Sequence, residues 1–502
     1  MDKGQSTHYD FSNTHTVVVG LAREGTALTR FLVKRGASVI ATDVKPAGEL
    51  AGNLAALEDL PVHFALGGHP LSLLDEADII FVSPGVPLEI PFLHEARRRG
   101  LPLSSETRLF TRLCPATVVG ITGSSGKTTT TALVGEMLRS AACQTWVGGN
   151  IGRPLIARLD EITSTGLVVM ELSSFQLEFF APWPGVEEGR GPEPDGVLFD
   201  PSGWSPSIAA VLNVTPNHLD RHVTMEAYIA AKAHILTHQQ PGDLAVLNLD
   251  DPLTREMGAA AGSRGQRVIW FSLQQELDEG AFLHNDELVL RLAGWETVLC
   301  RAGDLRLRGR HNLANALAAA ALVASASGAC EAGTGPVDLP MEALRRTVTS
   351  FPGVEHRLEL VREREGVRWY NDSSATTPER TVAALRSFNG PIVLLAGGRD
   401  KYLPWDEMAA VTWRKVRHLV LFGEAAGLIE GAMRDAQHDV DQPQRETTVH
   451  QAGSLAQAVD LAARLAQPGD LVLLSPGGTS FDAYQDFPAR GEHFRQLVHD
   501  LE

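Results

Sequence analysis

The chain has 502 residues, 44% of them hydrophobic and 21% charged, and at roughly 100–200 residues per domain this length favours about three domains. The net charge of −17 argues against a general attraction to nucleic acid or to anionic lipid surfaces, so no nucleic-acid partner is expected. The richest apolar stretch, residues 316–324, is too short to cross a bilayer and predicts a buried helix instead of membrane insertion.

The N-terminus and the cysteines favour a cytoplasmic protein. The first 15 residues are polar and lack the apolar centre of a signal peptide. The four cysteines are far apart and form no CxxC pair, so neither a disulfide framework nor a zinc site is expected. We expect a soluble enzyme that acts as a monomer.

The first segment alternates short apolar strands with a helix. Strands are predicted at residues 16–20, 37–42 and 79–82, with a helix from the low twenties to about residue 35. Gly20 and Gly25 form an incomplete dinucleotide fingerprint, and Asp43 lies near the spacing of a ribose-binding acid. This pattern predicts a nucleotide-like ligand but does not separate NAD from UDP.

The second segment continues the alternation of strands and helices. Strands are predicted at residues 117–121, 167–170, 210–214 and 244–249, and helices follow residue 127 and span residues 225–237. Residues 181–207 are rich in Pro, Gly, Glu and Trp, which predicts a long surface loop. Such repeated βαβ units are typical of parallel sheets.

The strongest local signal is the sequence GITGSSGKTT at residues 120–129. Backbone N–H groups of such a loop, backed by a helix N-terminus, bind phosphate oxygens, while Lys127 can reach the terminal phosphates and Thr128 can bind Mg²⁺. The match to a phosphate-binding loop is irregular, because Gly120 stands one place early. A glycine-rich turn with a chance lysine is the competing interpretation, and the loop alone does not choose ATP over GTP.

Two later clusters carry metal-binding side chains. Glu171 ends a predicted strand, where a carboxylate suits Mg²⁺, although a helix-capping or solvated glutamate explains it equally well. His218 and Asp220 follow the strand at 210–214, and an isolated histidine is more often structural.

The third segment begins near residue 351. Buried strands are predicted at residues 391–396, 418–422 and 470–474. His356-Arg357, residues 371–377 and residues 475–487 are polar clusters, each of which reads either as a ligand site or as a hydrogen-bonded turn.

Taken in order, the motifs of the chain resemble those of the Mur ligases, most closely the glutamate-adding members, from about residue 16 to residue 497. The motifs are GITGSSGKTTT, GGNIG, ELSSFQL, NVTPNHLDRH, AAKAHI, RGRHNLANALAA, FPGVEHRLE, NDSSAT and SPGGTSFDAYQDFPARG. The resemblance implies an α/β fold of three domains. These are a Rossmann-like domain at 1–114 that binds a UDP substrate, a P-loop ATPase-like domain with a mainly parallel sheet at 115–350, and a Rossmann-like domain at 351–502 that binds an amino acid.

The implied reaction adds D-glutamate to UDP-N-acetylmuramoyl-L-alanine, with ATP and two Mg²⁺ ions, through an acyl phosphate. Catalytic roles are implied for Lys127, His218 and Lys232, the last as a carbamate. ATP contacts are implied for Gly123, Ser124, Ser125, Gly126, Lys127, Thr128, Thr129, Asn312, Asn315, Arg357 and Asp372. Metal ligation is implied for Thr128, Glu171, His218 and carbamylated Lys232. UDP-substrate contacts are implied for Arg23, Asp43, Gly85, Asn150, Ser173 and Gln176, and amino-acid contacts for Thr376, Lys401, Ser480 and Phe487.

The chain departs from the family at Ser374, where a lysine that approaches the glutamate carboxylate is usual, and at Ser124-Ser125, where Thr-Asn is common. The first departure leaves L-glutamate open as the substrate. A folylpolyglutamate-synthetase-like ligase is a second alternative, but such enzymes lack a UDP-binding first domain, and residues 16–100 argue against it. An NAD-dependent oxidoreductase would leave GKTT unexplained, and a regulatory protein without turnover would not need Lys127, Glu171, His218 and Lys232.

Overall fold

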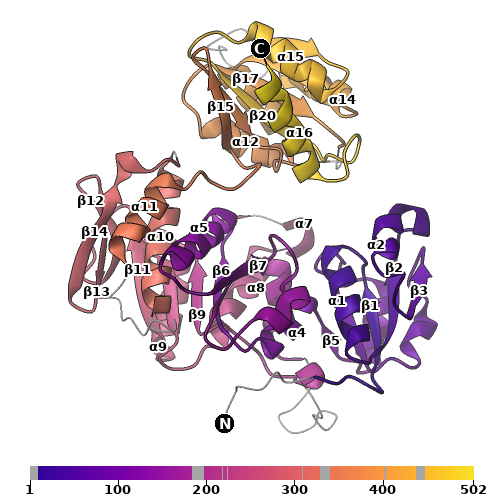
Figure 1. Cartoon of the computed structure of the whole chain (residues 1–502). Coiled ribbons are helices and arrows are strands. Elements are labelled where there is room, and N and C mark those ends of the chain that lie inside the picture. Colours follow the sequence, from indigo (N-terminus) through magenta and orange to yellow (C-terminus); the bar gives the residue numbers. More distant parts are fainter. Residues whose placement is uncertain are drawn as a thin grey trace. The chain divides into compact units, whose positions relative to one another are not determined.

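The computed structural model describes residues 9–183, 197–216, 219–222, 224–307, 309–327, 340–400, 403–436 and 447–501. It divides into two compact units (Figure 1): unit 1 comprises residues 1–305 and 310–350, and unit 2 comprises residues 306–309 and 351–502. Three mainly parallel sheets with helices around them confirm the predicted α/β class. Within the described ranges, no helix is long and apolar enough to cross a membrane.

The first sheet belongs to unit 1, is parallel throughout, and has the strand order β3-β2-β1-β4-β5. Helices cover both faces of this sheet, so its central strands are apolar on both sides. Val18 and Phe81 pack with α1 and α4 on one face, and Val17 and Ile80 pack with α3 on the other. The strands are β1 (His15–Val19), β2 (Ser38–Asp43), β3 (Val62–Leu66), β4 (Ile79–Val82) and β5 (Leu103–Ser104). The helices are α1 (Arg23–Lys34), α2 (Ala51–Ala55), α3 (Pro91–Arg98) and α4 (Glu106–Leu113).

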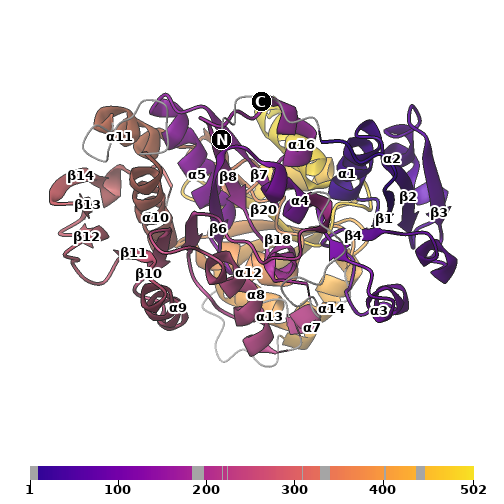
Figure 2. The same ribbon diagram turned by 90° about the horizontal axis from the view of Figure 1, so that it is seen from below.

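The second sheet, also in unit 1, has nine strands in the order β14-β13-β12-β11-β10-β9-β6-β8-β7. Its strands are β6 (Thr117–Thr122), β7 (Thr145–Gly149), β8 (Leu167–Glu171), β9 (Ile208–Val211), β10 (Leu244–Asn248), β11 (Arg267–Ser272), β12 (Gly280–His284), β13 (Glu287–Leu292) and β14 (Trp295–Arg301). Its helices are α5 (Lys127–Ser140), α6 (Ser174–Leu177), α7 (Leu219–His222), α8 (Met225–Thr237), α9 (Pro252–Ser263), α10 (Arg310–Ala326) and α11 (Met341–Ser350). The antiparallel strands β12 to β14 lie beside α11 at one end of the sheet (Figure 2).

The first two sheets of unit 1 share one hydrophobic core. Phe31 and Leu32 of α1 belong to the same buried cluster as Trp146 of β7 and Ile156 of the following turn. Because this apolar surface is continuous, the two sheets and their helices form one compact body.

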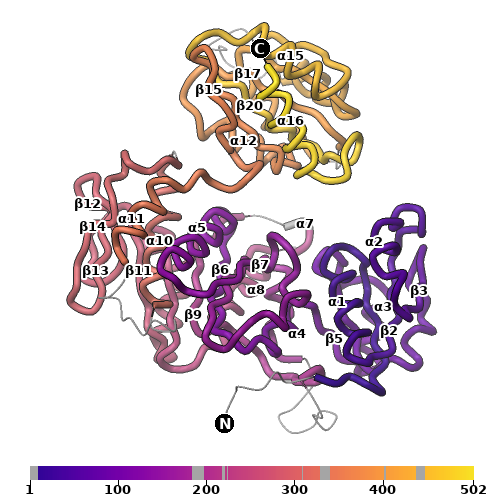
Figure 3. Tube along the Cα trace, in the orientation of Figure 1, coloured from indigo at the N-terminus to yellow at the C-terminus, as the bar shows by residue number. Residues whose placement is uncertain are grey.

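The third sheet forms unit 2, with the order β15-β16-β20-β17-β18-β19 and only β15 antiparallel. Helices α12 to α14 pack on one face and α15 and α16 on the other. Figure 3 shows α15 and α16 in yellow, close to the C-terminus of the chain. The strands are β15 (Glu359–Arg364), β16 (Val367–Asn371), β17 (Ile392–Gly397), β18 (Val416–Phe422), β19 (Thr448–Gln451) and β20 (Leu471–Gly477). The helices are α12 (Pro378–Arg386), α13 (Asp406–Lys415), α14 (Ala426–Ala436), α15 (Leu455–Leu465) and α16 (Phe487–Asp500).

Two expectations from the sequence need correction. The described flanks of the predicted surface loop are packed, because Trp183 and Trp204 lie against the core and Arg108 donates to the carbonyl oxygens of Phe179, Ala181, Asp200 and Ser202. Residues 184–196 of that loop lie outside the described residues. Cys143 is disulfide-bonded, which the wide spacing of the cysteines did not predict.

Candidate active site

The loop at residues 123–126 lies between the carboxyl end of β6 and the N-terminus of α5. Gly123 (φ +156°) and Gly126 (φ +81°) have positive φ values that side chains disfavour. A Cβ atom at Gly126 would lie 2.4 Å from Oδ1 of Asn315, so the close approach of α10 also requires glycine. The first N–H groups of α5 have no partner within the helix and favour an anion here.

Asn213, just after β9, holds this loop from the neighbouring strand. Its carbonyl oxygen accepts from the N–H of Ser124 (3.0 Å) and its Oδ1 from the N–H of Ser125 (2.9 Å). Sequence reasoning assigned no role to Asn213, although its position after a strand next to β6 could have indicated one.

Two lysine side chains reach the same backbone oxygen. Nζ of Lys127 donates to the carbonyl oxygens of Gly123 (2.9 Å) and Ser124 (3.3 Å), and Nζ of Lys232 donates to the Gly123 oxygen (2.9 Å). Lys232 is 1% exposed, and its Nζ lies 4.7 Å from the ring centroid of Tyr228. Burial, followed by the positive charge of Lys127, lowers the pKa of Lys232 well below its usual value, while Glu171 opposes the shift.

Glu171 ends β8 inside the same region and is 2% exposed. Its Oε1 accepts from Nδ2 of Asn150 (2.8 Å), whereas its Oε2 is buried and has no hydrogen-bond partner. A buried carboxylate oxygen without a partner is unfavourable, and a cation satisfies it. The residues present therefore fit Mg²⁺, an oxygen-binding ion.

The other predicted nucleotide and metal residues of unit 1 surround this loop. Thr128 and Thr129 lie in the first turn of α5, half-buried and buried. Nδ2 of Asn315 donates to Oδ1 of Asn312 (3.1 Å) at the start of α10. His218 lies outside the described residues, and among those described no group of three or more His, Cys, Asp or Glu side chains forms a metal site.

Among the residues predicted to contact the UDP substrate, Ser173 and Gln176 form a capping box at the start of α6. Nε2 of Gln176 is buried and donates to Oε1 of Glu24 (3.2 Å) and Oγ1 of Thr107 (3.1 Å). Through these contacts Gln176 joins α1 and α4 of the first sheet to α6. The sequence predicted a substrate contact for Gln176 and did not indicate this structural role.

Glu24 and Glu106 form a buried carboxyl pair at this junction. Thr107 donates to Oε2 of Glu106 (3.3 Å), and the N–H of Ile156 donates to Oε1 (3.2 Å). Burial raises the pKa of Glu24 to about 7, and burial followed by the charge of Glu24 raises the pKa of Glu106 to about 8.

The remaining predicted UDP contacts lie at the first sheet. Both oxygens of Asp43 accept backbone N–H groups, from Leu21 (2.8 Å) and Lys45 (2.9 Å), so its carboxylate shapes the loop after β1. A guanidinium nitrogen of Arg23 lies 3.5 Å from the carbonyl oxygen of Asn150. Gly85 stands in the turn after β4, where a Cβ atom would meet nothing within 4 Å.

In unit 2 the predicted residues gather on loops at the carboxyl ends of β16 and β20. Asp372 is 5% exposed, and its Oδ2 accepts from Oγ of Ser475 (2.8 Å). Burial raises the pKa of Asp372 to about 6, and the Ser475 hydrogen bond and Arg357 oppose this. Thr376 lies in the loop after β16, Ser480 lies between β20 and α16, and Phe487 is the first residue of α16. Lys401 lies outside the described residues.

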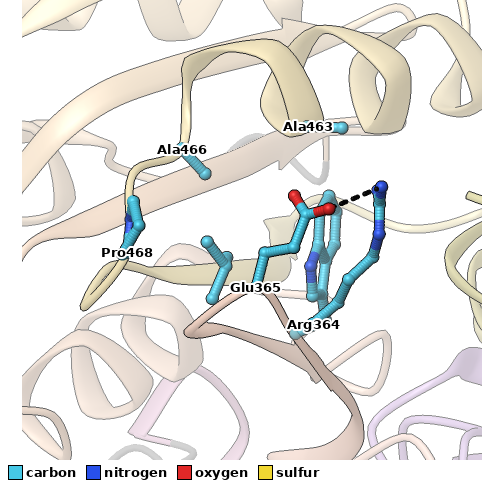
Figure 4. A pocket seen from close by; sticks show the side chains of 7 residues that line it. Arg364, Glu365, Ala463, Ala466 and Pro468 are labelled. Atoms are coloured by element: carbon cyan, nitrogen blue, oxygen red, sulfur yellow. Dashed lines mark hydrogen bonds and ion pairs between the residues drawn. The ribbon is translucent and has the colours of Figure 1, made fainter. Parts of the chain in front are cut away.

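A small pocket of unit 2 lies elsewhere, at the turn between β15 and β16 (Figure 4). Its volume of about 80 Å³ is below the roughly 300–1,000 Å³ of ligand pockets. Its lining residues are Arg364, Glu365, Val367, Trp369, Ala463, Ala466 and Pro468. None of the predicted site residues lines it, so we assign it no ligand.

The fold and the site define an α/β enzyme with a glycine-containing loop at a helix N-terminus. Family models match the chain in three places: a Mur ligase MurD-like N-terminal domain at residues 14–105, a Mur ligase middle domain at 121–183 and 201–323, and a Mur ligase glutamate ligase domain at 356–478. The chain belongs to the Mur ligase family, whose members are ATP-dependent amide ligases.

Curated relatives cover nearly the whole chain. It is 43% identical to the UDP-N-acetylmuramoylalanine–D-glutamate ligase of Symbiobacterium thermophilum, over 96% of this chain and 97% of that protein. It is 40% identical to the ligase of the same name from Pelotomaculum thermopropionicum, over 98% and 99%.

Solved structures agree in fold. The UDP-N-acetylmuramate–alanine ligase of Thermotoga maritima has a TM-score of 0.56 at 17% identity, covering 97% of this chain and 99% of that chain. A pseudomurein peptide ligase of Methanothermus fervidus has a TM-score of 0.51 at 18% identity, covering 98% and 100%.

Proposed function

We propose that this enzyme uses ATP to join D-glutamate to UDP-N-acetylmuramoyl-L-alanine in peptidoglycan precursor synthesis. The names of relatives with 43% and 40% identity over nearly the full chain support this reaction. The structural observation that carries it is the convergence of Lys127, Glu171 and Lys232 on one phosphate-binding loop. The enzyme acts as a monomer in the cytoplasm, where ATP is available.

The first chemical step is attack of the substrate carboxylate on the γ-phosphate of ATP, which forms an acyl phosphate and releases ADP. Such transfers depend on positioning and on neutralising charge. Lys127 leaves the carbonyl oxygens of its own loop and binds the phosphates instead, because a phosphate is the stronger acceptor for its ammonium group. Mg²⁺, held by Thr128 and by the free oxygen of Glu171, supplies charge neutralisation when bound.

Lys232 serves as a carbamate. A neutral amine attacks CO₂ and loses one proton, which turns a cationic side chain into an anionic oxygen ligand. The buried position of Lys232 and its lowered pKa favour the neutral amine that this reaction needs. Its position beside the loop carbonyl then suits it, together with His218, to hold a second Mg²⁺.

In the second step the amino acid reacts with the acyl phosphate. Its amine attacks the acyl phosphate carbonyl, the C–N bond forms, and inorganic phosphate leaves. We assign the glutamate to the loops of unit 2 that carry Thr376, Ser480 and Phe487, with Lys401, and we assign Arg357 and Asp372 to the nucleotide. L-glutamate stays the alternative substrate, because Ser374 stands where the family usually has a lysine near the glutamate carboxylate and has no positive charge to offer it.

Phosphate release measured with UDP-N-acetylmuramoyl-L-alanine, ATP and either D- or L-glutamate tests the proposal. We expect turnover with the D isomer that requires all three substrates. If only L-glutamate supports turnover, the stereochemical assignment changes to the L isomer. If neither isomer of glutamate stimulates phosphate release, the proposed reaction is overturned.

A further inference from the structure

Arg490, in the first turns of α16, is 0% exposed, and its side chain is the largest of the fully buried ones among the residues that the structure describes. Its guanidinium makes four hydrogen bonds: Nε to Oγ of Ser373 (3.0 Å), Nη2 to the Ser373 carbonyl oxygen (2.9 Å), and Nη1 to the carbonyl oxygens of Gly478 (3.2 Å) and Thr479 (3.0 Å). All four acceptors are uncharged oxygens. Burying a cation that has no carboxylate among its hydrogen-bond acceptors costs free energy. The four hydrogen bonds offset part of this cost, and they also join the loops that carry the acceptors.

These acceptors lie on loops that follow neighbouring strands. Ser373 follows β16, and Gly478 and Thr479 follow β20. Thr479 also exchanges two backbone hydrogen bonds with Arg399 (2.8 and 2.9 Å), which follows β17. The planar guanidinium therefore ties together the loops after β16 and β20, and the backbone bonds of Thr479 join them to the loop after β17.

The same loops carry the residues assigned to the amino acid. Ser480 directly follows Thr479, and the carbonyl oxygen of Phe487 accepts from Oγ of Ser373 (2.8 Å). Phe487 is 39% exposed, whereas Arg490 lies beneath these loops and is fully buried. A side chain so placed acts on a ligand only through the loops that it holds.

We propose that Arg490 is a positioning residue for the amino-acid substrate, because it fixes the spacing between the loop of Ser373 and the loop of Ser480. This inference rests on the proposed function, which places glutamate on these loops. A lysine keeps the charge but has no planar fork, so it cannot bind both loops with the same geometry. Loss of this spacing weakens glutamate binding more than nucleotide binding.

The test is steady-state phosphate release by the full-length enzyme, with KM measured separately for glutamate, ATP and the UDP substrate. We expect Arg490→Lys to raise the KM for glutamate at least about tenfold, while the other two KM values change less than about threefold. Arg362→Lys is the matched control, because Arg362 also donates to uncharged backbone oxygens of this region, those of Val498, His499 and Leu501 at the far end of α16. It should leave all three KM values unchanged.

A second variant covers the case in which Arg490→Lys does not fold. Ser373→Ala removes one acceptor of Arg490 and the bond to Phe487 but no large side chain, and it should raise the KM for glutamate selectively. The positioning role would be overturned if the folded variants had the wild-type KM for glutamate. It would also be overturned if the KM values for all three substrates rose by the same factor. A wild-type enzyme that uses no isomer of glutamate would instead overturn the proposed function and this inference with it.

Discussion

Two ammonium groups that donate to the same carbonyl oxygen lie close enough for their positive charges to repel each other. Lys127 and Lys232 both donate to Gly123, but Lys232 is 1% exposed and Lys127 is half-buried. Burial and the neighbouring charge therefore favour a neutral Lys232 and leave the cation on Lys127. This division suits one lysine for phosphate and the other for reaction with CO₂.

Lys127→Met keeps the length of the side chain and removes its charge. We expect phosphate release to fall by at least about 100-fold, because the charge that develops on the phosphates loses a fixed partner. The exposed Lys34 of α1 provides the control, since Lys34→Met should release phosphate at the wild-type rate. Near-normal turnover of Lys127→Met would remove this residue from the mechanism.

Lys232→Ala should also be inactive, but for a different reason, because it cannot form the proposed carbamate. Added formate or acetate should restore part of its phosphate release, since a small carboxylate can occupy the place of the carbamate. The same carboxylates should not help Lys127→Met, which lacks a cation. Failure of every small carboxylate with Lys232→Ala would argue against carbamylation.

The sequence indicated the residues whose chemistry is local. Lys127 and Glu171 are recognisable because a glycine-rich loop or a strand end stands beside them in the chain. Asn213 and Tyr228 were missed as parts of the site, because their hydrogen bonds to Ser125 and Ser124 of the loop arise only when distant segments fold together. Gln176 matched a substrate-contacting stretch, but its amide group is committed to Glu24 and Thr107.

Helices α1 and α4 bring Glu24 and Glu106 together, and this makes the stability of unit 1 depend on pH. A carboxyl group whose pKa is raised by folding keeps its proton in the folded protein when the unfolded chain has lost it. The stability that these protons provide is complete below about pH 4.5, the usual pKa, and is lost as the pH rises to about 8. Ionising both carboxyl groups inside the folded protein is therefore unfavourable.

Glu106→Gln tests this dependence, because glutamine stays neutral at every pH. Between pH 5.5 and 8 the wild-type urea midpoint should fall, and the fall should be smaller in the variant. Glu95→Gln is the control: its partners Arg98 and Arg99 hold the pKa of Glu95 at about 2, so it stays ionised throughout this range. Parallel wild-type and Glu106→Gln curves would contradict the account of the pair.

Element positions followed from the sequence where the pattern was strong. The predicted strand at residues 79–82 and the predicted helix at residues 225–237 match β4 and α8, because buried apolar runs and caps mark their ends. The antiparallel strands β12 to β14 were not predicted, since their polar and apolar residues carry no βαβ pattern. The packed flanks of residues 181–207 were also missed, because Arg108 binds them from a distant helix.

At the scale of the whole molecule, the order of motifs predicted the family and the three α/β sheets. Composition and periodicity could not predict that the first two sheets share one core, because that depends on which apolar faces meet. The domain boundaries at residues 114/115 and 350/351 remain predictions. The central claim concerns the chemistry of the molecule as a whole: the substrate carboxylate is activated by phosphorylation before the amide forms.

Oxygen labelling tests this claim most directly. UDP-N-acetylmuramoyl-L-alanine labelled with ¹⁸O in its carboxylate, incubated with ATP, D-glutamate and the wild-type enzyme, should transfer one labelled oxygen to each phosphate released, as measured by mass spectrometry. Phosphate that carries no ¹⁸O above the natural level while the amide product accumulates would contradict an acyl phosphate and the account built on it.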